Sequence, residues 1–319
     1  MNAAALEQFG PPGVLTLHTL PVPQPGPGEV LIEVRAAGIG SWDASVRGGS
    51  WRPYGRPSFP ILPGTDGAGI VAARGLHVRR FNIGDRVWAS DYANPKGGFY
   101  AEYAAVKVDN VAIMPSRFDF LEAAAGLTTG LTALQGIDDA LRVRKGDTVL
   151  IFGATGGVGT LAIQFAKRKH ARILATASGR EASVLAKRLG ADSVFDSRDA
   201  DAVERLDELA PDGIDAVLVL VSTDTLEACL DLMKPDGRVA YPTGVWPEPG
   251  KRRKIRVFSY NAETGPREFE RLEQAAIEAR LKVPIAAEFS LEQAAKAHER
   301  LHEGHILGRM VLRIGQDRR

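Results

Sequence analysis

The pattern of hydrophobic and polar positions changes about a third of the way along the chain. In the first region, residues 30–35 alternate apolar and polar side chains (Val-Leu-Ile-Glu-Val-Arg) after a turn at 21–28 that is dense in Pro and Gly. This alternation predicts a strand with one buried face. Further short strands are expected at residues 69–73, 86–89 and 101–106. The first region is therefore predicted to be β-rich.

From about Leu121 the pattern becomes one of strands that alternate with helices. Residues 121–137 predict a helix, and a buried strand at 147–151 precedes an amphipathic helix at 159–169. The same order recurs at 172–175 with 180–189, at 216–221 with 224–233, and in a strand at 238–241. Such alternation is typical of βαβ units on a parallel sheet. A helix at 291–302 and a strand at 308–314 are expected to close the chain.

The length, composition and net charge of the chain indicate which classes of protein it can belong to. A chain of 319 residues suits two domains, and 45% hydrophobic with 25% charged residues is ordinary for a globular protein. The 40 basic and 39 acidic side chains give a net charge of +1, which argues against a nucleic-acid partner. The basic run at 251–254 indicates a solvated loop, and its role stays open.

The single cysteine, Cys229, excludes an intramolecular disulfide and a cysteine-based structural zinc site. It lies in an apolar helical pattern, so a buried and unreactive thiol is expected. The first residues show no basic segment followed by an apolar core, and no stretch of about 18 apolar residues could span a membrane. We therefore expect a cytoplasmic protein with no membrane partner.

The strongest motif is a glycine-rich turn between the buried strand at 147–151 and the helix after it. Its residues are Gly153, Ala154, Thr155, Gly156, Gly157, Val158 and Gly159. Glycines allow a tight turn in which backbone N–H groups approach a pyrophosphate, and the helix N-terminus favours an anion. A strand before the turn and a helix after it are the context that this fingerprint requires. The motif predicts dinucleotide binding.

The end of the next strand indicates which dinucleotide binds. NAD-specific sites place Asp or Glu there to bond the ribose 2′-OH. This chain has no carboxylate between Ala175 and Arg180. Ser178 and Arg180 could instead bind a 2′-phosphate, although Arg180 could also be a capping or surface residue of the following helix. NADPH is the expected cofactor.

In many segments the sequence resembles the medium-chain dehydrogenase/reductase superfamily, in its zinc-free quinone oxidoreductase-like branch. Besides the glycine-rich turn, the segments that carry this resemblance are 28–32, 36–39, 63–69, 84–87, 98–103, 130–133, 189–192 and 232–238. The resemblance implies an α/β fold in which a Rossmann doubly wound parallel sheet is inserted into a GroES-like β domain. Residues 1–123 and 283–319 would form the GroES-like catalytic domain, and residues 124–282 the NADP-binding domain. The nicotinamide and the substrate would occupy a cleft between the two domains. The resemblance to this family also implies a homodimer.

The family's zinc-dependent members carry a Cys near Gly40 and Gly-His-Glu in place of 64–66. This chain offers neither a thiolate nor an imidazole at those positions, so no metal is expected. The quinone reductase branch often has Asn at the position of Gly40 and Tyr at that of Ser45, and both differences fall in the segment that would face the substrate. No catalytic side chain is therefore assigned. The candidates for the substrate pocket are Gly40, Ser41, Ser45, Trp51 and Tyr54, the last two from a stretch at 50–59 whose role stays open.

The resemblance adds cofactor contacts at Thr129, at Val221 and at Gly244, which follows a late strand. Asp43 and Asp66 are expected to fix loops by accepting backbone N–H bonds. The sequence thus predicts an NADPH-dependent reductase that transfers a hydride to a quinone or an enone. A reductase of 2-alkenal or enoyl-thioester double bonds is the alternative within the same class. A non-catalytic NADPH-binding sensor or structural protein is the alternative from another class.

One motif indicates a different chemistry. His298-Glu299-Arg300-Leu301-His302 matches the His-Glu-x-x-His signature of zinc proteases. A third ligand is required, and the residues beyond His302 do not provide the expected continuation. We therefore interpret this segment as a solvated helix face that carries two histidines.

Overall fold

The computed structural model describes residues 1–51 and 58–315. The chain forms two compact units. Unit 1 comprises Met1–Thr128, Thr264–Phe269 and Ile285–Arg319, and unit 2 comprises Thr129–Glu263 and Glu270–Pro284. The domain boundaries expected at 123/124 and 282/283 stay a prediction.

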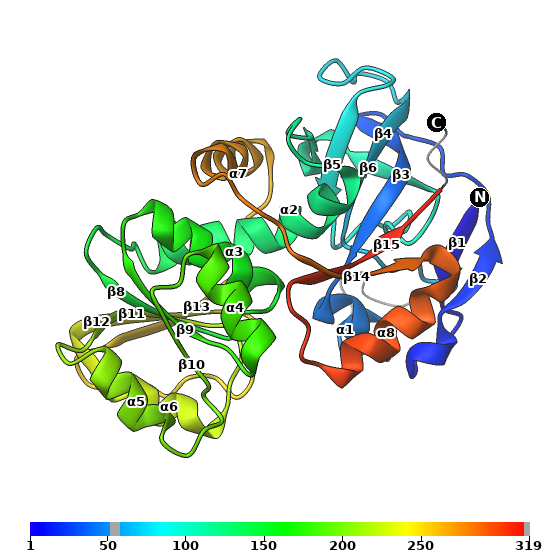
Figure 1. Cartoon of the computed structure of the whole chain (residues 1–319). Coiled ribbons are helices and arrows are strands. Elements are labelled where there is room, and N and C mark those ends of the chain that lie inside the picture. Colours follow the sequence, from blue (N-terminus) through cyan, green and yellow to red (C-terminus); the bar gives the residue numbers. More distant parts are fainter. Residues whose placement is uncertain (52–57, 316–319) are drawn as a thin grey trace. The chain divides into compact units, whose positions relative to one another are not determined.

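Unit 1 is built on a sheet of seven strands in the order β14-β15-β3-β4-β5-β7, with β6 also paired to β3 (Figure 1). The strands are β3 (Glu29–Ile39), β4 (Asp66–Arg74), β5 (Arg86–Ser90), β6 (Tyr103–Lys107), β7 (Val111–Ile113), β14 (Ile285–Ser290) and β15 (Arg309–Arg313). β1 (Asn2–Ala5) and β2 (Thr16–Thr19) form a separate antiparallel pair. The helices are α1 (Ser41–Gly48) and α8 (Ala294–Glu303).

Strand β3 is the centre of this unit because it is long enough to hold several partners. Its register with β4 shifts between Val34 and Ala36, which is a bulge in the ladder. Before the bulge β3 pairs with β6, and after it with β15, so that the strand that closes the chain lies beside Ile39. The buried core around β3 includes Phe81, Phe99 and Tyr100.

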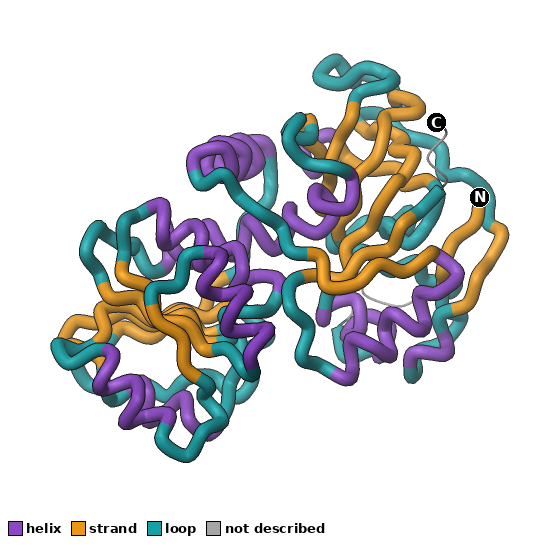
Figure 2. The backbone as a smooth tube through the Cα atoms, in the orientation of Figure 1, coloured by secondary structure: helices purple, strands orange, loops and turns teal. Residues whose placement is uncertain are grey.

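Unit 2 contains a six-stranded sheet in the order β10-β9-β8-β11-β12-β13, and every pair is parallel. The strands are β8 (Thr148–Phe152), β9 (Arg172–Thr176), β10 (Ser193–Phe195), β11 (Ile214–Val219), β12 (Met233–Pro242) and β13 (Arg256–Tyr260). Figures 1 and 2 show α3 (Gly157–Arg168) and α4 (Arg180–Leu189) on one face, and α5 (Ala202–Leu209) and α6 (Asp224–Leu230) on the other. This doubly wound sheet confirms the predicted α/β class.

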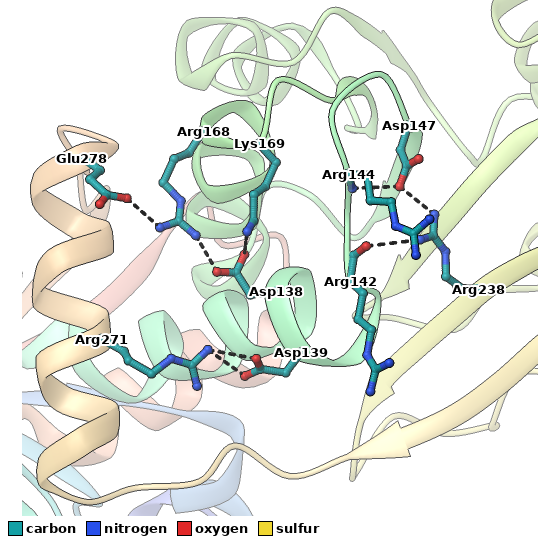
Figure 3. Close-up of polar contacts among 10 residues, drawn as sticks. All are labelled: Asp138, Asp139, Arg142, Arg144, Asp147, Arg168, Lys169, Arg238, Arg271 and Glu278. Atoms are coloured by element: carbon teal, nitrogen blue, oxygen red, sulfur yellow. Dashed lines mark hydrogen bonds and ion pairs between the residues drawn. The ribbon is translucent and has the colours of Figure 1, made fainter.

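Two further α-helices lie in the described part of the chain. α2 (Phe120–Gln135) continues directly into a π-helical turn, η3 (Gly136–Ala140), and α7 (Pro266–Glu278) follows β13. Charged side chains tie η3 to its neighbours in unit 2 (Figure 3). Arg168 of α3 donates to Asp138 at 2.5 Å and to Glu278 of α7 at 2.9 Å. Because the Arg168 side chain is only 17% exposed, solvent screens these ion pairs less than it screens ordinary surface pairs.

The strands predicted in the β-rich region and the strands and helices predicted for the Rossmann-like region are present. Among the elements that the residue pattern did not predict are helix α1, which follows β3 directly, and β13 and α7. Cys229 is fully buried, which confirms the expected buried thiol, and burial raises its pKa to about 11. Among the described residues, no helix is long and apolar enough to cross a bilayer.

The bulge at β3 requires a glycine opposite it, which leads to a first prediction. A Cβ added at Gly69 would lie 2.1 Å from the carbonyl oxygen of Glu33, a backbone atom that cannot turn away. We expect Gly69→Ala to lower the free energy of unfolding by about 1–3 kcal/mol, the usual range for overpacking. Urea titration measures this change. Gly13→Ala is the control, because a Cβ there meets no atom within 4 Å. If Gly69→Ala and Gly13→Ala have equal free energies of unfolding, the backbone of Glu33 does not approach residue 69 so closely.

Candidate functional site

The parallel sheet of unit 2 reverses its order between β8 and β11. From β8 the chain proceeds outward through β9 and β10, then returns to the other side of β8 with β11 and continues outward to β13. Ligands of doubly wound sheets bind at the carboxyl ends of the strands, at this reversal. The segments that leave these ends are 153–156 after β8, 177–179 after β9, 220–223 after β11 and 243–244 after β12.

The glycine-rich turn after β8 lies at this reversal. Gly153 has a φ of +90°, a conformation that favours glycine, and its N–H donates to Oγ1 of Thr176 at 2.8 Å. A Cβ at Gly153 would lie 2.9 Å from Cγ1 of Val221, so the turn also abuts the end of β11. The turn is thus held by the two strands next to β8.

Helix α3 begins immediately after the turn, with Gly157 and Val158 in its first turn and Gly156 as its N-cap residue. A Cβ at Gly156 would meet only the carbonyl oxygen of Gly153, at 4.0 Å, so the space in front of this residue is open. A Cβ at Gly159, by contrast, would lie 2.4 Å from that same oxygen. Gly159 therefore serves the packing of helix on strand, whereas Gly156 leaves an approach to the helix N-terminus and its unpaired N–H groups.

The end of β9 carries a feature that the sequence pattern did not show. The hydroxyl of Ser178 donates to Oδ1 of Asp196, which follows β10, at 2.8 Å. Arg198 binds the same carboxylate, with Nη2 3.2 Å from Oδ2. Burial alone would raise the pKa of Asp196, but hydrogen bonds from Arg198 and Ser178 outweigh it and lower the pKa. An ionised carboxylate from a residue 18 positions further along the chain therefore lies beside Ser178.

The other cofactor candidates occupy different surroundings in unit 2. Arg180 is exposed at the first position of α4, and no described residue accepts a hydrogen bond from its side chain. Val221 is 44% exposed after β11, and Gly244 has a φ of +103° after β12 with open space at its Cβ position. Thr129 is buried within α2. All but Thr129 follow the carboxyl ends of the parallel strands.

Unit 1 contains a cluster of buried charges where β3 ends and β4 begins. Arg309, at the start of β15, donates through Nη2 to both carboxylate oxygens of Asp66, at 3.1 and 3.2 Å, and through Nε to the carbonyl oxygen of Ile39 at 2.8 Å. Both side chains are almost completely buried. The expectation that Asp66 fixes a loop through backbone N–H groups is therefore incomplete, because an arginine 243 positions away is its main partner.

Asp43 is the second buried carboxyl group of this cluster. Its Oδ2 accepts the N–H of Gly40 at 2.8 Å, and its Oδ1 accepts the N–H and the hydroxyl of Thr65 at 3.2 and 3.3 Å. The bond to Gly40 closes the first turn of α1, as the third residue of a capping box does. Burial, and then the charge of Asp66, raise the pKa of Asp43 to about 7. A carboxyl group so perturbed is typical of functional sites.

Trp42 in α1, which the sequence analysis did not single out, lies against Gly40. A Cβ at Gly40 would come within 2.3 to 2.7 Å of three carbon atoms of the Trp42 indole. The guanidinium of Arg309 lies over the same ring, 4.6 Å from its centroid. The indole is half-buried, and its N–H has no hydrogen-bond partner among the described residues. Residue 40 must therefore be glycine while Trp42 keeps this position.

The remaining candidates for the substrate pocket are spread over unit 1. Ser41 is exposed at the start of α1, and the hydroxyl of Ser45 donates back to the carbonyl oxygen of Ser41 at 3.2 Å. Trp51 stacks on Tyr92 with ring centroids 6.0 Å apart. Tyr54 lies outside the described residues. Ser41 and Ser45 thus share α1 with Trp42 and Asp43.

The expectation of a solvated helix face at the His-Glu-x-x-His motif is wrong for His298. This side chain is buried, whereas His302 is exposed. Nη1 of Arg47 lies 2.9 Å from Nδ1 of His298, and Oη of Tyr100 lies 3.1 Å from Nε2. A guanidinium only donates, so Nδ1 is the acceptor and Nε2 carries the hydrogen that it donates to Tyr100. Burial, and then the charge of Arg47, lower the pKa of His298 to about 3, so the ring is neutral.

Side chains that could hold a metal are not brought together in the described part of the chain. No group of three or more His, Cys, Asp or Glu residues has a suitable arrangement there. His298 is committed to Arg47 and Tyr100, and Asp66 to Arg309.

Known proteins resemble this chain over almost its whole length. A family profile described as alcohol dehydrogenase GroES-like domain matches residues 26–116, and one described as zinc-binding dehydrogenase matches residues 189–312. The quinone oxidoreductase of Mus musculus is 32% identical, over 98% of this chain and 97% of its own length.

Solved structures agree with this relationship. One described as an NAD-dependent alcohol dehydrogenase superposes with a TM-score of 0.91 at 31% identity, over 99% of this chain and 100% of its own. The quinone oxidoreductase of Escherichia coli, complexed with NADPH, gives a TM-score of 0.86 at 27% identity, over 98% of this chain and 99% of its own.

A GroES-like unit and a Rossmann unit with a glycine-rich turn at its reversal define the class of nucleotide-binding oxidoreductases. The chain belongs to the medium-chain dehydrogenase/reductase superfamily, in its quinone oxidoreductase-like branch. The resemblance found in the sequence is therefore confirmed, and the protein is an enzyme of the quinone reductase type.

The raised pKa of Asp43 makes stability depend on pH. The folded protein binds the proton of this carboxyl group more tightly than the unfolded chain does. In the unfolded chain the pKa of Asp43 is near the ordinary value of 3.8. The free energy of unfolding should therefore fall as pH rises from about 4 to about 7, by at most about 1.4 kcal/mol per pH unit from this group. Asp43→Asn should lose that dependence.

Urea titrations of both proteins between pH 5 and pH 8 measure the effect. Asp66, Arg309, Thr65 and Tyr100 surround Asp43 in both proteins, so the difference between the two curves isolates the substituted group to a first approximation. The advantage of the natural protein over Asp43→Asn should shrink as pH rises. A constant difference would show that the pKa of Asp43 is not raised.

Proposed function

We propose that the protein is an NADPH-dependent, zinc-free oxidoreductase that transfers a hydride to a quinone or an enone-type small molecule. The observation that carries this proposal is the open approach at Gly156, at the reversal of a doubly wound sheet. The kinship with quinone oxidoreductases supports the choice of acceptor. The homodimer and the cytoplasmic location expected from the sequence stay predictions.

The proposed reaction needs little covalent chemistry from the protein. The nicotinamide supplies the hydride, and one proton completes the reduction of a quinone to a hydroquinone. The protein binds and orients both molecules, excludes water, and places donors near the acceptor oxygen, where negative charge develops. Ser41 is such a donor candidate because it is exposed, whereas the hydroxyl of Ser45 already donates within α1. Gly40, Thr65 and Asp66 offer no thiolate or imidazole that would hold a catalytic zinc.

NADPH is the proposed cofactor because Arg180 and Arg198 lie on the segments that follow β9 and β10. Arg180 is free to bind a 2′-phosphate, and Arg198 neutralises the carboxylate of Asp196 that would otherwise repel it. Ser178 gives its hydrogen to Asp196 and would support the phosphate only by rotating. The E. coli quinone oxidoreductase with bound NADPH favours the same choice.

Steady-state oxidation of NADPH with a panel of quinones, cyclic enones, 2-alkenals and an enoyl thioester tests the activity. We expect quinones or enones to accelerate oxidation, and Gly156→Val to abolish both binding and turnover, because its side chain would fill the approach to the helix N-terminus. The variant should remain folded, since no protein atom lies close to its Cβ. Tight NADPH binding with no acceptor turned over would instead indicate a non-catalytic NADPH-binding protein. A preference for enals or thioesters would favour the alternative reductase.

Arg180→Ala tests the choice of cofactor. We expect the Kd for NADPH to rise roughly tenfold or more and the Kd for NADH to stay unchanged, because only NADPH has the charged 2′-phosphate. Fluorescence titration measures both constants. Arg188→Ala, at the other end of α4, is the matched control. Equal losses for both cofactors would refute the role of Arg180, and tighter binding of NADH by the natural protein would assign Asp196 to the ribose hydroxyls instead.

A further inference from the structure

The Trp42 indole is the largest apolar group on α1, and it is neither fully buried nor free to move. Arg309 lies over one face of the ring, and Arg309 is itself fixed by two bonds to Asp66 and one to Ile39. Gly40 lies against a face of the ring, because a Cβ there would come within 2.3 to 2.7 Å of three of its carbon atoms. A ring held in this way loses little conformational freedom when a ligand packs on its exposed part.

Glycine at position 40 and tryptophan at position 42 depend on each other. Any side chain at residue 40 would overlap the indole, since the overlap already begins at Cβ. The indole therefore occupies the space into which a residue-40 side chain would project. A ligand at this point of unit 1 would therefore contact the indole ring of Trp42 and not a side chain of residue 40.

The properties of that face select a class of ligand. An indole is flat and electron-rich, so it packs best on a flat, electron-poor ring. A quinone ring has both properties, whereas an open-chain enal has too little flat surface to cover the indole. The indole N–H lacks a partner in the described chain, so a phenyl ring at this position should retain the packing.

From this geometry we infer that Trp42, held over Gly40 by Arg309, is a specificity-determining residue that favours ring-shaped quinone acceptors over open-chain enones. The inference rests on the proposed function, because it takes α1 as part of the acceptor site. It goes beyond that function by naming the side chain that sets the preference.

The test compares kcat/KM for a benzoquinone and for a small open-chain enone, with NADPH as the donor. Trp42→Ala should lower the ratio of these two values about tenfold, mostly through the KM for the quinone, because it removes the aromatic face. Trp42→Phe should keep the ratio within about threefold of that of the natural protein. The Kd for NADPH should not change in either variant, because Trp42 belongs to unit 1 and the proposed nucleotide site to unit 2.

A second measurement tests the position of the ring without relying on activity. Gly40→Ala should lower the melting temperature of the natural protein, because the added Cβ overlaps the indole. In the Trp42→Ala background the same substitution should have little effect, since the overlapping ring is gone. Equal losses in both backgrounds would show that the indole does not lie over Gly40.

The outcomes separate the two proposals. If the natural protein oxidises NADPH with neither acceptor, the proposed function fails and the inference fails with it. If both acceptors are reduced and Trp42→Ala leaves the ratio unchanged, only the inference is overturned. A Trp42→Phe variant as impaired as Trp42→Ala would also overturn it, because an aromatic face alone would then not be sufficient.

Discussion

The ion pair between Arg309 and Asp66 is the constraint on which the arrangement of unit 1 depends. Both groups are out of contact with water, and removing one partner of such a pair costs several kcal/mol because the other charge stays buried. The pair attaches β15 to the start of β4 and, through Ile39, to the end of β3. The ion pair also limits which residue can occupy position 38. A Cβ at Gly38 would lie 2.9 Å from Nη2 of Arg309 and 2.6 Å from the carbonyl oxygen of Ala124, so the ion pair and the close backbone approach both require glycine there.

The glycine-rich turn of unit 2 differs from this cluster, because its shape depends on backbone geometry and not on buried charged side chains. Gly153 turns the chain at a positive φ, Gly159 lets α3 pack closely, and Gly156 leaves the helix N-terminus open. Such a site can accept a phosphate group without a dedicated basic side chain. A carboxylate and two arginines, Asp196, Arg180 and Arg198, lie on the segments after β9 and β10. In the proposed function, the balance of their charges sets the preference between NADPH and NADH.

Features encoded by neighbouring residues could be predicted from the sequence, and features formed by distant residues could not. Strand alternation, helical periodicity and the glycine-rich turn are local, and they gave the fold class and the nucleotide fingerprint. The partner of Asp66 lies 243 positions away, and that of Arg47 lies 251 positions away, so no spacing rule reveals them. Asp196 reaches Ser178 only because β10 pairs with β9. His298 could have been found, since it shares a helical face with the apolar residues Ala294 and Leu301, which indicates a buried position.

The ion pair of Arg309 and Asp66 holds the Trp42 indole against Gly40, and the acceptor ring is expected to pack on this indole. A crystal structure of the enzyme with a non-reacting quinone analogue would locate that ring. We expect it to pack on the Trp42 indole, with Arg309 still bound to Asp66 and the indole still against Gly40. An analogue bound elsewhere, or an indole turned away from Gly40 to admit it, would show that Trp42 does not receive the acceptor.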